Sequence, residues 1–235
     1  MTVSKEANGL KKLRVVVASD LHLGSIVGRR HLEQLVRQAN ALKPDLMLLP
    51  GDVLDDAVEP FIRHDYGRVL GGIRAVYGTY ATLGNHEYYG GGIEAYVTSM
   101  RDHGIPVLLD EIVQIADCVY LIGRKDKTDR SRASVAELTT GLSADKTIIL
   151  MDHQPSAILE IADAGVDVSL HGHTHRGQMA PNHWITRRLF ELDWGYKQFG
   201  ELHAFVSSGF GTWGPPIRLG SRSEILCITV RFDPQ

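Results

Sequence analysis

The chain of 235 residues lacks several features that would place it in a specialised class. Its only two cysteines, Cys118 and Cys227, exclude a disulfide-rich scaffold and a thiolate metal cluster. Both lie in apolar stretches, so we expect buried free thiols. With 25 basic and 28 acidic side chains, the chain also lacks the positive excess that attracts nucleic acids, and we expect no nucleic-acid polymer as a partner.

Long apolar runs are absent as well. No uncharged apolar stretch approaches the roughly 18 residues that a membrane-spanning helix needs. The apolar block 15–18, which follows basic residues, is too short for the core of a signal peptide. The sequence as given predicts a soluble protein, with the catalytic domain of a membrane-associated protein as the alternative. We expect one domain over residues 1–235, in which residues 1–12 form an N-terminal tail or linker.

What the sequence does contain is an alternation of short apolar runs with helical periodicity. Continuous apolar runs of this length are typical of buried strands, whereas apolar residues three and four apart are typical of helices. The strands predicted in this way are 13–19, 45–49, 76–83, 112–115, 118–122, 147–151, 166–170, 205–208 and 225–232. The predicted helices are 32–42, 61–73, 93–100 and 157–162. Residues 176–200 break this rhythm. The alternation predicts an α/β domain with a mixed sheet system.

Side chains that can bind metal recur directly after five of the predicted strands. They are Asp20 and His22, then Asp52 and Asp55, then Asn85 and His86, then Asp152 and His153, and finally His171, His173 and His175. Ligand sites in open α/β sheets lie beyond the carboxyl ends of the strands, so these clusters predict one convergent site. Carboxylate, imidazole and amide donors suit manganese, iron, zinc or nickel. There are enough donors for two ions, an arrangement that clamps phosphate esters.

In this order, Asp-x-His, Gly-Asp-x-x-Asp, Gly-Asn-His-Glu, a single His and Gly-His-x-His resemble the motifs of the calcineurin-like metallophosphoesterase family. The resemblance covers residues 20–175 and implies a four-layer αββα sandwich, in which two mixed β-sheets are flanked by helices. It implies that one metal ion is held by Asp20, His22, Asp52 and His175. It implies that a second ion is held by Asp52, Asn85, His153 and His173.

The resemblance also implies the reaction. A hydroxide between the ions would attack phosphorus in line, and His86 would act at the leaving oxygen as general acid or charge partner. Asp55 would accept a hydrogen bond from His86 and thereby fix its tautomer. We favour a phosphodiesterase, because a protonated His86 helps to expel poor leaving groups. The alternatives are a phosphomonoesterase or protein phosphatase, and a pyrophosphatase acting on a lipid-linked nucleotide sugar. A non-catalytic interaction module is a more distant alternative, since no ligand departs from the pattern.

Three further residues are candidates for substrate contacts: Arg176, Tyr88 and Trp213. Arg176 follows a predicted ligand and would grip a second phosphate or a carboxylate, or else be an exposed charge. The stretches 172–178 and 207–220 are similar to bacterial phosphodiesterases that often carry N-terminal membrane segments. Aromatic and arginine residues between 182 and 200 suit a membrane surface or a lipid-linked phosphate ester. The alternative is a loop that packs over the sheets and lines the site. The sequence does not define an oligomeric state.

Overall fold

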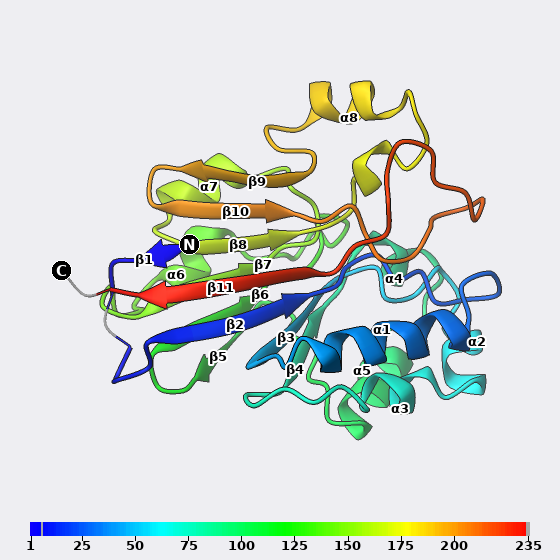
Figure 1. Ribbon diagram of the computed structural model, residues 1–235, viewed down its shortest axis with the longest axis horizontal. Helices are drawn as coiled ribbons and strands as arrows, with labels where there is room; N and C mark the ends of the chain where they lie inside the picture. Colours follow the sequence, from blue (N-terminus) through cyan, green and yellow to red (C-terminus); the bar gives the residue numbers. More distant parts are fainter. Residues whose placement is uncertain (6, 234–235) are drawn as a thin grey trace.

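A computed structural model of the chain, which describes residues 1–5 and 7–233, shows two β-sheets packed face to face with helices on both outer surfaces (Figure 1). The first sheet has the strand order β1-β11-β2-β3-β4, and the second has the order β5-β6-β7-β8-β10-β9. The layers therefore run helix, sheet, sheet, helix, and the predicted αββα sandwich is confirmed.

The strands of the first sheet are β1 (Thr2–Val3), β2 (Lys12–Val17), β3 (Leu46–Pro50), β4 (Thr79–Thr82) and β11 (Leu226–Phe232). Those of the second sheet are β5 (Glu111–Ile115), β6 (Val119–Gly123), β7 (Thr147–Met151), β8 (Val168–His171), β9 (Gly195–Phe199) and β10 (Leu202–Val206). Both sheets are mixed: β2, β3 and β4 run parallel, as do β6, β7, β8 and β10, whereas β11 pairs antiparallel with β2. The parallel strands of each sheet therefore end at a common edge.

The helices are α1 (Arg29–Ala41), α2 (Val58–Arg63), α3 (Tyr66–Leu70), α4 (Asn85–Tyr89), α5 (Ile93–Asp102), α6 (Val135–Thr139), α7 (Ile158–Asp163) and α8 (His183–Leu189), with a short 3-10 turn at His175–Gly177. One apolar core joins the first sheet to α1, α2, α3 and α5, and another joins the second sheet to α6 and α7. Among the described residues, no helix combines the length and apolarity needed to cross a lipid bilayer.

The core between the sheets follows from strand alternation. Leu48 of β3, Leu121 of β6 and Val230 of β11 belong to one cluster of buried side chains. Along β11, alternate residues face this core, as predicted for Leu226, Ile228, Val230 and Phe232. Cys227 points the other way and is exposed, so the prediction of two buried thiols holds for Cys118 only.

The structure bears on two further predictions. Within the N-terminal tail or linker predicted over residues 1–12, Thr2 and Val3 pair with β11, and Lys12 begins β2. The helix predicted over 61–73 is divided into α2 and α3. The break falls at Asp65, whose backbone is left-handed with φ of 52°, a conformation that no helix can propagate.

Candidate metal centre

The predicted ligands lie in loops at the carboxyl ends of parallel strands from both sheets. Asp20 and His22 follow β2, Asp52 follows β3, and Asn85 begins α4 directly after β4. In the second sheet, His153 follows β7, and His173 and His175 follow β8. The seven residues, far apart in the sequence, are thereby brought together at the carboxyl ends of these strands.

One group of candidate metal-binding atoms comes from Asp20, His22 and His175, whose ligand atoms lie within 4.8 Å of one another. The Nε2 atoms of His22 and His175 are 3.0 Å apart, and His175 Nε2 is 3.3 Å from Asp20 Oδ1. All three side chains are buried. Burial lowers the pKa of His175 to about 4, so its imidazole is neutral and has a lone pair to offer.

The second group comes from Asp52, His153 and His173. Asp52 Oδ2 lies 3.0 Å from His153 Nε2 and 3.9 Å from His22 Nε2, so this carboxylate stands between the two groups. Although burial raises the pKa of Asp52, its histidine neighbours, His153 foremost, lower it well below the usual range. Asn85 Oδ1 is 2.8 Å from His173 Nδ1, which adds the amide to this group.

The backbone at these positions is shaped for the site. Asp20, His22, Asp52, His173 and His175 all have positive φ, between 48° and 70°. This left-handed conformation is costly for residues other than glycine and collects at functional sites. It turns each side chain out of the strand direction and towards the neighbouring loops. The glycines beside the ligands leave no room for substitution, since a Cβ on Gly84 would stand 2.2 Å from Asp52 Oδ1.

The donors fit a dinuclear centre. Asp20 Oδ2 is buried and has no hydrogen-bond partner among the described residues. His153 Nε2 is also buried and lies 3.0 Å from Asp52 Oδ2, at an angle that does not form a hydrogen bond. Buried carboxylates and imidazoles in such a position are normally paired or bound to metal. His153 Nδ1 is 2.8 Å from the Pro50 carbonyl, which accepts its proton and leaves Nε2 as the donor atom. These clusters of aspartate and histidine are consistent with a dinuclear metal site.

Glu87 of the Gly-Asn-His-Glu motif has a structural role that could not be predicted from its position in the sequence. Its fully buried carboxyl accepts hydrogen bonds from the backbone N–H groups of Asp52, Leu54 and Gly84, at 2.7–3.1 Å. Burial and the neighbouring Asp52 raise the pKa of Glu87 to about 7. The carboxyl ties the loop after β3 to the turn after β4, so it fixes Asp52, which stands between the two groups of ligand atoms, in place.

His86 has a different partner from the one predicted. Its Nδ1 is 2.7 Å from Asp56 Oδ1 and 3.0 Å from the backbone carbonyl of Asp55. The Asp55 carboxylate lies instead 3.4 Å from His22 Nδ1. Consecutive side chains in this turn point in different directions, so Asp56 takes the predicted place of Asp55. Burial lowers the pKa of His86, but Asp52 and the two hydrogen-bond acceptors outweigh it and raise the pKa overall.

A cavity of about 460 Å³ opens over the ligands. Its lining includes three histidines and four apolar or aromatic side chains: His86, His173, His175, Tyr89, Met179, Ile185 and Trp213. The Tyr89 ring lies against that of His86, with centroids 5.4 Å apart. Trp213 lines this cavity, and its contact with substrate stays a prediction. Tyr88 does not line it: its hydroxyl is directed to Asp129, 3.4 Å away, and Tyr89 lines the cavity. Arg176 also lies elsewhere, stacked on the Trp194 ring at 3.8 Å in a neighbouring hollow.

Known proteins resemble this chain in sequence and in fold. The sequence profile named Calcineurin-like phosphoesterase matches residues 13–177. An uncharacterized metallophosphoesterase of Campylobacter jejuni is 31% identical, over 98% of this chain and 62% of that protein. A Danio rerio protein named "transmembrane protein with metallophosphoesterase domain" is also 31% identical, over 97% of this chain and 55% of its own length. The chain therefore spans little more than half the length of these relatives.

Among solved structures, the calcineurin-like phosphoesterase YfkN of Bacillus subtilis superposes with a TM-score of 0.50 at 14% identity, covering 94% of this chain and 91% of that chain. This likeness concerns the fold alone. Together with the profile match and the clustered aspartate and histidine ligands, it shows that the chain belongs to the calcineurin-like metallophosphoesterase family of metal-dependent hydrolases.

Proposed function

We propose that the protein is a phosphodiesterase that works with two metal ions. The observation that carries this proposal is the lining of the cavity over the ligands, which includes no lysine or arginine but has an apolar wall. A phosphate monoester brings two negative charges and no second organic group. A diester brings one charge and a second substituent, which Met179, Ile185 and Trp213 can contact. The lining therefore favours the diester.

The residues that would hold the ions are the two groups described above. Asp20, His22 and His175 would hold one ion, and His153, His173 and Asn85 the other, with Asp52 shared between them. When bound, two such ions supply positive charge for the phosphoryl oxygens and make hydroxide available near neutral pH. Metal identity is left open among manganese, iron, zinc and nickel, because the donor set suits each of them.

His86 would donate a proton to the leaving oxygen. Asp56 and the Asp55 carbonyl accept the proton of Nδ1, which fixes the imidazole ring and favours its charged form. The ring lines the cavity and has its second nitrogen to donate. A positioned acid of this kind contributes about 10²–10⁴-fold to the rate when the leaving group is a poor one.

The test compares bis-p-nitrophenyl phosphate with p-nitrophenyl phosphate on one metal-loaded preparation. We expect metal-dependent turnover of both, with a higher kcat/KM for the diester. Asp52→Asn and His153→Ala should each lose at least about 100-fold in activity. Asp117→Asn is the matched control, because Asp117 is also left-handed but exposed and remote from the site.

A preference for the monoester would instead support the phosphomonoesterase or protein phosphatase. Turnover of a nucleotide-sugar pyrophosphate in place of both would support the pyrophosphatase. If neither ester were turned over and no metal were bound, the interaction module would be the better description.

A further inference from the structure

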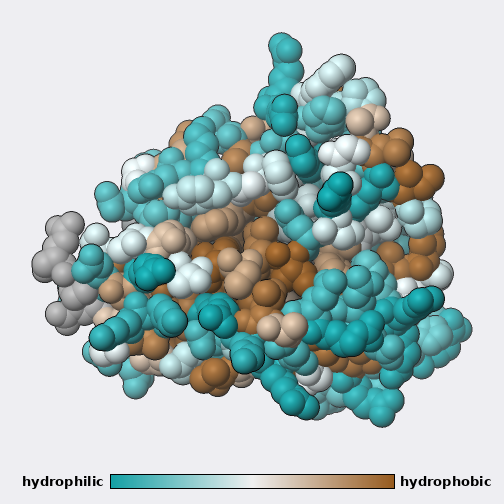
Figure 2. All heavy atoms as spheres, viewed as in Figure 1, coloured by the Kyte–Doolittle hydropathy of each residue, from teal (hydrophilic) through white to brown (hydrophobic). Residues whose placement is uncertain are grey.

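A group of exposed apolar side chains includes two residues, Ile185 and Trp213, that line the cavity. Three members of the group lie on α8 and three on the loop between β10 and β11, and each is more than half exposed: Trp184, Ile185, Leu189, Trp213, Ile217 and Leu219. We call these six side chains the apolar rim. Figure 2 shows hydrophobic atoms at the upper right of the molecule, on the side where Figure 1 draws α8 and this loop. Apolar side chains gathered in this way on a surface mark an interaction site.

The two parts of the apolar rim are held together by a buried side chain. The Gln178 amide donates to the Trp213 carbonyl at 2.7 Å and accepts from the Trp213 N–H at 2.8 Å. The backbone adds two hydrogen bonds, from Ala180 N–H to the Leu219 carbonyl and from Leu219 N–H to the Gln178 carbonyl. The rim is therefore a preformed surface and not two independent loops.

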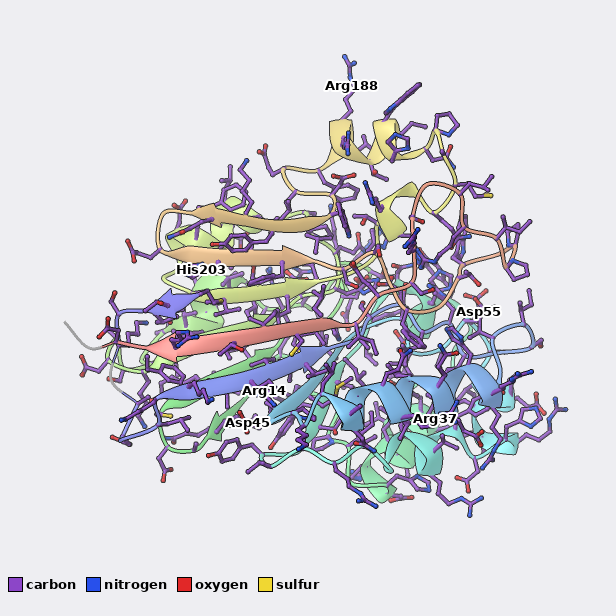
Figure 3. The ribbon with its side chains drawn as sticks, in the orientation of Figure 1. Arg14, Arg37, Asp45, Asp55, Arg188 and His203 are labelled. Atoms are coloured by element: carbon purple, nitrogen blue, oxygen red, sulfur yellow. The ribbon has the colours of Figure 1, made fainter. Side chains whose placement is uncertain are left out.

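Arginine outnumbers acidic residues around the apolar rim. Residues 176–193 and 209–224 contain five arginines and three acidic residues, Glu191, Asp193 and Glu224, although the whole chain has a net charge of −3. The Asp193 carboxylate accepts a hydrogen bond from Thr186 of α8, and the Glu224 carboxylate accepts one from Trp194. Arg187 and Arg188 are exposed in the last turn of α8, and Arg222 is exposed beyond the loop. In Figure 3, Arg188 projects from α8 away from the body of the molecule. The surface is thus suited to a partner that carries negative charge.

We propose that the apolar rim docks on a bilayer surface containing anionic phospholipid, and that the cavity receives its phosphodiester substrate from that surface. Exposed tryptophan and leucine beside arginine is the composition of segments that lie in the membrane interface. Each arginine near an anionic surface strengthens the attraction. Association with a second copy of the chain is disfavoured, because a two-fold contact would bring these arginines against one another.

The apolar rim is continuous with the site. Ile185 and Trp213 belong to the rim and also line the cavity, as do the candidate ligands His173 and His175. A lipid headgroup entering from a docked bilayer would meet an apolar wall on its way to the ligands. This part of the inference rests on the proposed function, whereas docking itself does not.

The experiment measures binding of the 235-residue chain to vesicles by co-sedimentation. The vesicles are phosphatidylcholine alone, or phosphatidylcholine mixed with phosphatidylglycerol. We expect binding to the anionic vesicles, weakened by salt because surface charges are screened. Two double variants, Trp184→Ala/Leu189→Ala and Arg187→Glu/Arg188→Glu, test the rim. Each should reduce the partition coefficient between vesicles and water by at least about tenfold. Neither pair lines the cavity, so both variants should retain turnover of bis-p-nitrophenyl phosphate.

Matched controls come from other exposed sites: Ile62→Ala/Val76→Ala for the apolar pair and Arg63→Glu/Arg68→Glu for the charged pair. Equal binding by the controls and the rim variants would overturn the proposal, as would no binding by the unaltered chain. A dimer in sedimentation velocity that dissociates in Trp184→Ala would assign the rim to a protein interface and also overturn it. Turnover without vesicle binding would reject docking alone, whereas vesicle binding without turnover would reject only the phosphodiesterase.

Discussion

Glu87 illustrates how much a single side chain can contribute to a site without touching the reacting atoms. Its carboxyl accepts hydrogen bonds from three backbone N–H groups of two loops, and one of those loops carries Asp52, the proposed shared ligand. Leaving buried N–H groups without acceptors costs free energy, since they lose water as well as their partner. The integrity of the metal centre therefore depends on a residue that need not bind metal.

We expect Glu87→Gln to reduce the free energy of unfolding by about 1–3 kcal/mol, because the amide replaces one acceptor oxygen with a donor that faces an N–H group. Urea unfolding monitored by circular dichroism measures this change. Glu94→Gln, an exposed position on α5, is the control and should have no measurable effect. Unchanged stability of Glu87→Gln would contradict the three-bond arrangement.

Asp56→Asn should lower kcat on bis-p-nitrophenyl phosphate by about tenfold or more, because the His86 ring loses its charged acceptor. The loss should be larger for a diester with a poor phenol leaving group, which needs acid catalysis more. Asp55→Asn should affect metal affinity more than kcat, since its carboxylate lies beside His22. If Asp55→Asn lost more kcat than Asp56→Asn at saturating metal, Asp55 would be the functional partner of His86 after all.

At this scale, motif spacing identified the residues that the structure brings together but not the direction of each neighbour. Asp55 and Asp56 are adjacent acids, and the choice between them depends on backbone torsions in the turn. The same holds for Tyr88 and Tyr89, where only Tyr89 lines the cavity. Each of these pairs of identical neighbours in the sequence offered two candidates for one position in the site. Only the tertiary structure shows which of the two residues occupies it.

At the scale of elements, α6 carries a local stabilising feature with a clear test. Ser134 Oγ accepts from the Glu137 N–H, and the Glu137 carboxylate accepts from the Ser134 N–H, which is a capping box. Ser134→Ala should reduce the free energy of unfolding by about 1 kcal/mol. Ser25→Ala, an exposed serine outside the helices, is the control for thermal unfolding. A shift no larger than that of the control would rule out a contribution of the cap.

The strands that precede the ligands were predictable because they are short, continuous and apolar. The strand predicted at Thr147 to Met151 has those bounds in the structure. Helices of five residues, such as α4 and α6, were missed, since they show too few residues for periodicity to be visible. Strand β9 was missed because it is largely exposed, so its sequence lacks an apolar pattern. Its pairing with β10 is a tertiary property.

At the scale of the whole molecule, the candidate ligands are divided between the two sheets. Asp20, His22, Asp52 and Asn85 follow strands of the first sheet, and His153, His173 and His175 follow strands of the second. Bound metal would therefore connect the two halves of the sandwich and stabilise the fold as a whole. Motif order in the sequence predicted the convergence, but not that it joins two separate sheets.

Removal of metal should accordingly lower the stability of the entire domain. At a free metal concentration about 100 times the dissociation constant, binding adds about 2.7 kcal/mol, and chelation would remove this contribution. Differential scanning calorimetry with and without EDTA measures the shift in Tm. Asp52→Asn, which lacks the bridging carboxylate, should show little shift. An equal shift in that variant would place the stabilising metal at another site.

Strand β11 returns from the end of the second sheet to lie between β1 and β2 of the first. The consequence concerns the order of synthesis. All strands of the second sheet lie between residues 111 and 206, so that sheet can form while the chain is still being made. One edge of β2, however, has no partner until residues 226–232 leave the ribosome. An unpaired apolar strand edge invites pairing with other chains, so the nascent first sheet is the part of this fold that most needs protection by a chaperone.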